Sequence, residues 1–119
     1  MVVLKRNPAL MKKVNMTSLT NQEVQFEDVQ SGILILEFGT EWCGYCKAAQ
    51  PIIRSAIDSY PEVTHIKIED GKGKRLGRLF TIKLWPTLVF LNNGMEIARL
   101  VRPTDAESIK AALKQLITA

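Results

Sequence analysis

The 119-residue sequence lacks the residues that several common architectures require. Its two cysteines are too few for a fold built on a framework of disulfides. With one histidine beside them, a zinc site within a single chain would lack its fourth ligand. No run of about 18 apolar residues is present, so we expect no membrane-spanning helix. There is no internal repeat, low-complexity tract or interdomain linker.

The N-terminal segment lacks the apolar core of a secretory signal, because Pro8 and charged residues interrupt it. We therefore expect a cytoplasmic protein, although a mature exported chain would also have lost its signal. Sixteen basic against twelve acidic residues leave a charge of +4, a mild excess that does not by itself indicate nucleic acid. The length and the 46% hydrophobic content predict one globular domain with a real core.

The hydrophobic pattern predicts an α/β domain with a mixed central sheet. We expect strands at 33–38, 63–69, 87–91 and 96–101, with a shorter one near 14–16. Helices are predicted at 21–30, at 46–60 and from 104 to the C-terminus. "TNQE" at 20–23 and "TDAE" at 104–107 resemble capping boxes for the first and last of these helices. Residues 1–15 are predicted to be an N-terminal extension, and residues 16–119 the domain.

The stretch "EWCGYCK" holds both cysteines, between a buried strand and a helix. At the start of a helix, the N–H groups and the helix dipole stabilise the thiolate of Cys43. Cys46 lies about one turn later, close enough to form a disulfide. A zinc site shared between subunits with His65 remains an alternative. A structural staple is another, but so short a loop adds little stability. A redox pair is favoured, with Cys43 attacking and Cys46 resolving.

Together these motifs resemble the thioredoxin family. The matching segments are "ILILEFGTEWCGYCK", Pro51 inside the following helix, "WPTLVFLNNG" and the final amphipathic helix. The resemblance implies a thioredoxin fold, with a central mixed β-sheet flanked by helices on both faces. It also implies a cis peptide bond at Pro86 and no metal or organic cofactor.

By the same resemblance, the substrate-binding residues are Trp42, Gly44, Tyr45, Trp85 and Pro86. The backbone of Trp85 is expected to pair with an extended substrate segment. The Trp85 side chain has two open interpretations: it forms an apolar lip of the groove, or it packs on Trp42 or Tyr45. Tyr45, unlike proline, has an N–H, which we expect to donate to the Cys43 thiolate.

Trp85 is itself a departure from the family pattern, because a smaller aliphatic residue is more usual there, and two further positions also depart from it. Glu37 stands where thioredoxins carry a buried Asp, and we expect burial to raise its pKa and to suit it as a proton relay to Cys46. The alternative is a Glu that reaches solvent or pairs with Lys67 or Lys83. Arg102 stands where a small Gly is usual, at the edge of the substrate groove.

The predicted function is thiol–disulfide exchange on protein disulfides, most simply as a reductant. An oxidase or isomerase with the same cysteines is an alternative, because direction depends on redox potential. A non-catalytic binding module with a thioredoxin fold is another. The expected partners are protein disulfide substrates and a thioredoxin-reductase-type electron donor. We expect a monomer that binds neither nucleic acid nor membrane.

Overall fold

The computed structural model describes residues 24–119 and contains one four-stranded sheet in the order β2-β1-β3-β4. Its strands are β1 (Ile33–Gly39), β2 (Thr64–Glu69), β3 (Thr87–Asn92) and β4 (Met95–Val101). β1 pairs with β2 in parallel, whereas the pairs β1–β3 and β3–β4 are antiparallel. β1 and β3 are therefore central, which is why both read as nearly continuous apolar runs.

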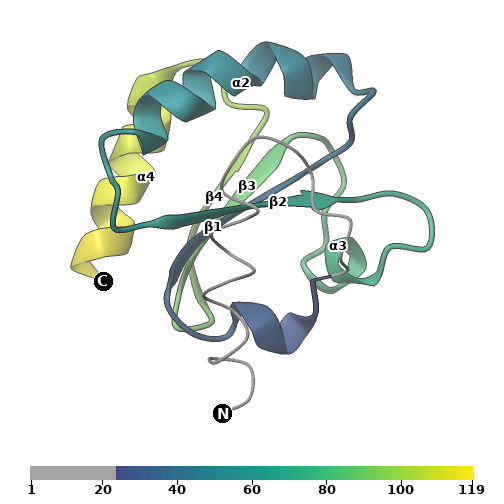
Figure 1. Cartoon of the computed structure of the whole chain (residues 1–119), viewed down its shortest axis with the longest axis horizontal. Helices are drawn as coiled ribbons and strands as arrows, with labels where there is room; N and C mark the ends of the chain where they lie inside the picture. The colour runs from purple at the N-terminus through teal and green to yellow at the C-terminus, as the bar shows by residue number, and fades with distance from the viewer. Residues whose placement is uncertain (1–23) are drawn as a thin grey trace.

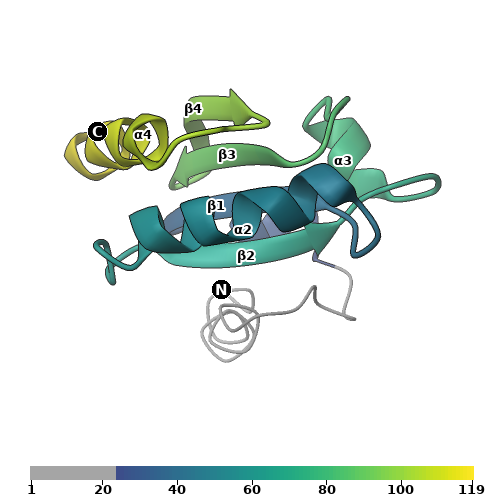
Figure 2. The same cartoon turned by 90° about the horizontal axis from the view of Figure 1, so that it is seen from above.

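Helices cover both faces of the sheet. α2 (Gly44–Ile57) and α4 (Ala106–Thr118) lie on one face, while α3 (Arg75–Leu79) and the 3-10 turn η1 (Phe26–Val29) lie on the other (Figure 1). Seen from above, α2 runs along β1 and β2, and α4 lies next to β3 and β4 (Figure 2). Alternate strand residues serve the two faces. Ile35, Leu88 and Phe90 pack with α2 and α4, and Leu34, Leu36 and Phe38 pack on the η1 and α3 side.

The fold confirms the predicted mixed sheet with helices on both faces, and each strand differs from its predicted bounds by one residue. Pro51 lies inside α2, and the Trp85–Pro86 peptide bond is cis. None of the helices in residues 24–119 is long and apolar enough to cross a membrane. The predicted strand near 14–16 and the boundary between residues 15 and 16 lie outside the described residues. That boundary stays a prediction.

All three predicted helices differ from the structure in their bounds, and α2 begins two residues earlier and ends three residues earlier than the predicted 46–60. The described part of the helix expected at 21–30 is only the η1 turn: Gln25 N–H donates to Asp28 Oδ2 (3.0 Å) at its start, and Gly32, with a φ of 89°, follows its end. The capping box at 20–23 lies outside the described residues. At the last helix the cap is Asp105, one residue after Thr104: its carboxylate accepts the Ser108 N–H at 2.8 Å.

Candidate active site

Cys43 is the N-cap of α2, and both cysteines are free thiols. The backbone at Cys43 is extended, and its Sγ accepts the N–H of Cys46 at 3.2 Å. The sulfur thus occupies the place of a capping oxygen, at the positive end of a 14-residue helix. The donor is Cys46 N–H. Within residues 24–119, Cys43 Sγ accepts only this N–H, three positions after the cap, and the hydrogen bond expected from the Tyr45 N–H is not formed.

Cys46 lies against the end of β1, where its environment disfavours ionisation. Burial raises the pKa of the Cys46 thiol to about 12, and the hydrogen bond and charge of Cys43 act in the same direction. A backbone hydrogen bond from Thr40 opposes this rise. Space beside the sulfur depends on Gly39, since a Cβ there would lie 2.6 Å from Cys46 Sγ. The two cysteines therefore differ in chemistry although they are one helical turn apart.

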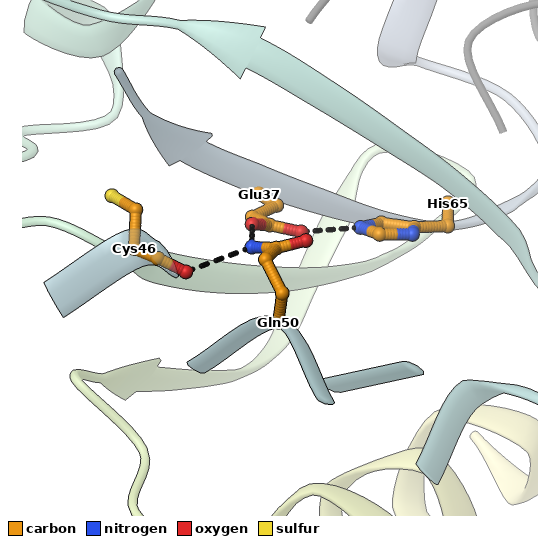
Figure 3. A network of polar contacts seen from close by, with 4 residues as sticks. All are labelled: Glu37, Cys46, Gln50 and His65. Carbon is orange, nitrogen blue, oxygen red and sulfur yellow. Dashed lines mark hydrogen bonds and ion pairs between the residues drawn. The ribbon is translucent and has the colours of Figure 1, made fainter. Parts of the chain in front are cut away.

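Glu37, Gln50 and His65 form a polar cluster beside Cys46 (Figure 3). We call it the buried polar cluster, because Glu37 is buried and the other two side chains are partly buried. The Glu37 side chain is nearly inaccessible, and its Oε1 lies 2.7 Å from His65 Nε2. The Gln50 amide donates to Glu37 Oε2 (2.6 Å) and to the Cys46 carbonyl (3.0 Å). The cluster connects the middle of β1 and the start of β2 to the first turns of α2.

These contacts correct the expected pKa of Glu37. Burial alone raises the pKa of Glu37, but the hydrogen bond and charge of His65, with the hydrogen bond of Gln50, outweigh it. The pKa of Glu37 therefore lies below its ordinary value of 4.5, and the carboxylate is ionised at neutral pH. Lys67, one of the two lysines considered as a partner, adds a smaller charge effect in the same direction.

A second group of side chains near the cysteines contains three aromatic rings and one guanidinium. We call it the aromatic side, and its residues are Trp42, Tyr45, Trp85 and Arg102. Trp42 is 73% exposed and packs edge-on against Trp85, with ring centroids 5.5 Å apart. The Trp85 indole N–H also donates to Asp70 Oδ2 at 2.9 Å. Packing on Trp42, one of the two interpretations of Trp85, is thus confirmed. The substrate-binding roles of Trp85 and the other predicted residues stay predictions.

Arg102 joins the cysteine loop to the Trp85–Pro86 segment. Its guanidinium carbon lies 3.9 Å from the Tyr45 ring centroid, and its Nε donates to the Trp85 carbonyl at 2.8 Å. The Arg102 N–H donates to the Pro86 carbonyl, also at 2.8 Å. Its φ of 51° lies in the left-handed region, where a glycine would be less strained. Arg102 therefore sits next to both of the segments predicted to contact substrate.

Sequence reasoning missed Gln50, Asp70 and Gly39 as parts of the site. The spacing of Gln50, four residues after Cys46 on one helix, was a usable signal. His65 was considered only as a zinc ligand. Its pairing with Glu37 follows from the parallel register of β1 and β2. His65 is opposite Ile35, and Glu37 is two residues further along β1, so its side chain is on the same face of the sheet. Within residues 24–119, no group of three or more His, Cys, Asp and Glu is placed to hold a metal ion.

Comparisons with known proteins agree with this geometry. The sequence profile of the thioredoxin family matches residues 11–115. The solved structure of reduced thioredoxin 2 from Pseudomonas aeruginosa is 45% identical, with a TM-score of 0.77, covering 87% of this chain and 97% of that one. Thioredoxin from Chlamydia trachomatis is 29% identical over 94 residues, which are 79% of this chain and 92% of the relative.

Yeast thioredoxin-1, from Saccharomyces cerevisiae, is 28% identical over 100 residues, covering 84% of this chain and 92% of the relative. The chain therefore belongs to the thioredoxin family. Members of this family are thiol–disulfide oxidoreductases that act on protein disulfides, and the paired cysteines described above fit that activity.

Proposed function

We propose that this protein reduces protein disulfides through Cys43 and Cys46. The Cys43 thiolate attacks one sulfur of the substrate disulfide, which breaks that bond and releases the other substrate sulfur as a thiolate that takes up a proton. Cys46 then loses its proton and attacks Cys43. The second substrate sulfur leaves Cys43 as a thiolate and takes up a proton, so the substrate is released as a dithiol. The substrate has gained two electrons, and the protein is left oxidised, with a Cys43–Cys46 disulfide.

The observation that carries this proposal is the asymmetry of the two sulfurs. Cys43 Sγ caps α2 and accepts a backbone N–H, which suits a nucleophilic thiolate. Burial raises the pKa of Cys46 to about 12, so its thiol stays protonated until the mixed disulfide forms. A protein with no redox role has no physical need for two thiols in this arrangement.

We further propose that Glu37 accepts the proton of Cys46 during resolution. Its lowered pKa keeps it in the basic form at neutral pH. Its negative charge raises the pKa of the Cys46 thiol, so the two groups interact and the thiol keeps its proton until resolution. The Cys46 sulfur points away from the carboxylate, while the Cys46 carbonyl meets Gln50 (Figure 3). The route we propose therefore passes through one bridging water, with transfer completed as the new S–S bond forms.

The proposal includes the direction of thiol–disulfide exchange and the source of its electrons. The likeness to thioredoxins supports a reductant that receives electrons from a thioredoxin-reductase-type donor. A monomer suffices for the exchange, because both sulfurs belong to one helix start. The cytoplasmic location suggested by the sequence stays a prediction.

Insulin reduction in the presence of dithiothreitol tests the activity. We expect the wild-type protein to accelerate precipitation of the insulin B chain, and Cys43→Ser to reduce the rate to that of dithiothreitol alone. Equal rates for the two proteins would contradict the proposal and favour a binding module.

A redox titration of the Cys43–Cys46 pair against glutathione tests the direction. We expect a potential of about −270 mV, as in a thioredoxin-like reductant. A value of about −120 to −180 mV would instead assign an oxidase or isomerase with the same site.

A further inference from the structure

Arg102 carries a positive charge near the cysteine loop. The exchange reaction proposed above does not use this charge. The Arg102 backbone is held by the Pro86 carbonyl, and its side chain is fixed at two points, the Tyr45 ring and the Trp85 carbonyl. Tyr45 is two residues after the attacking sulfur, and Trp85 directly precedes the cis proline. A polypeptide bound across both segments must therefore pass the guanidinium.

The end of the guanidinium remains available for a ligand. Only Nε is engaged in a hydrogen bond with the described residues, so the two terminal nitrogens keep their N–H donors. No carboxylate within residues 24–119 forms an ion pair with Arg102. The Asp70 carboxylate accepts the Trp85 indole N–H at 2.9 Å and forms no ion pair with Arg102. Stacking on Tyr45 also restricts the side chain before any ligand arrives, which lowers the entropic cost of binding.

We propose that Arg102 binds a carboxylate of the substrate, so that the protein prefers disulfides with an Asp or Glu next to the attacked cysteine. The planar, fixed fork matches the geometry of a carboxylate, with two parallel N–H···O bonds from the terminal nitrogens. The bond from Nε to the Trp85 carbonyl can persist in this arrangement. This inference rests on the proposed function and adds to it the chemical class of the substrate.

Two synthetic peptides provide the test. Each contains one intramolecular disulfide and has blocked termini, and they differ only in Glu or Gln immediately before the first cysteine. We measure kcat/KM for reduction of each peptide by the reduced wild-type protein. We expect the Glu peptide to be preferred about fivefold at low salt, the size of a partly shielded charge pair, with the preference lost as salt is raised.

Arg102→Gln should abolish the preference, because it keeps side-chain length and a donor but removes the charge. Arg102→Lys should retain part of it, because it keeps the charge without the planar fork. Lys114→Gln is the matched control: Lys114 is exposed near the end of α4, and removing its charge should leave the preference intact.

Equal kcat/KM values of the wild-type protein for the two peptides would overturn the proposal, and this comparison needs no variant to fold. Faster reduction of both peptides by Arg102→Gln, with an unchanged ratio, would also overturn it and show that Arg102 obstructs the site. If the wild-type protein reduces neither peptide, the proposed activity fails and this inference fails with it.

Discussion

The two sides of the cysteine pair are built from opposite kinds of surface. On the aromatic side, Trp42 is 73% and Tyr45 60% exposed, whereas Glu37 in the buried polar cluster is 3% exposed. Exposed rings and a stacked guanidinium suit contact with a polypeptide. A buried carboxylate with two hydrogen-bond partners suits control of a proton. The contrast supports the proposal that substrate contact and proton transfer take place on different sides of the cysteine pair.

Glu37→Gln should produce the largest change on the buried side. Without the carboxylate, loss of the Cys46 proton depends on solvent, so resolution of the mixed disulfide should slow about tenfold to a hundredfold near pH 7. The rate should then recover as pH rises and hydroxide takes over. Stopped-flow tryptophan fluorescence between pH 6 and 9 measures this step.

Glu96→Gln is the control for that experiment, since Glu96 is a partly exposed carboxylate paired with Arg99 on β4. It should leave resolution unchanged. A Glu37→Gln rate equal to the wild-type rate throughout pH 6 to 9 would show that the carboxylate plays no part in proton transfer.

Gly39→Ala tests the close approach of Cys46 to β1. The added Cβ would lie 2.6 Å from Cys46 Sγ, so the sulfur or the strand must shift. We expect a loss of about 1 to 3 kcal/mol in the free energy of unfolding, measured with urea. Gly44→Ala is the matched control on the exposed side: its Cβ meets nothing within 4 Å, and its effect should stay within about 0.5 kcal/mol. Equal losses of unfolding free energy in the two variants would show that Gly39 is not more closely packed than Gly44.

Asp70→Ala should have the smallest effect and should act on the aromatic side alone. Losing the bond to the Trp85 indole should loosen that side chain and raise KM for peptide disulfides about twofold to fivefold. The resolution rate should not change. Glu69→Ala, which removes the adjacent exposed carboxylate, is the control. A slower resolution step in Asp70→Ala would show that the two sides are coupled.

Local patterns predicted most of the fold. The apolar runs of β1 and β3 indicate strands that are covered on both faces. The change from a strand pattern to a helix pattern places Cys43 at the start of α2. Cap positions were harder to assign, since Thr104 and Asp105 can both serve as caps and only backbone geometry selects Asp105.

The chemistry of the site was predicted less completely. Glu37 was recognised as buried, but its lowered pKa depends on His65, which is 28 residues away. Such a contact follows from strand register rather than from neighbouring sequence. The position of Arg102 against Tyr45 likewise results from the path of the chain after β4, and no periodicity reveals it.

The central claim is that Cys43 attacks and Cys46 resolves, and trapping the mixed disulfide tests it most directly. Reduced Cys46→Ser and Cys43→Ser proteins are each mixed with a disulfide peptide, and the intact mass of the products is measured. We predict rapid accumulation of a covalent adduct on Cys43 in Cys46→Ser, and little adduct in Cys43→Ser, where burial keeps the remaining thiol protonated. Faster adduct formation in Cys43→Ser would contradict the account.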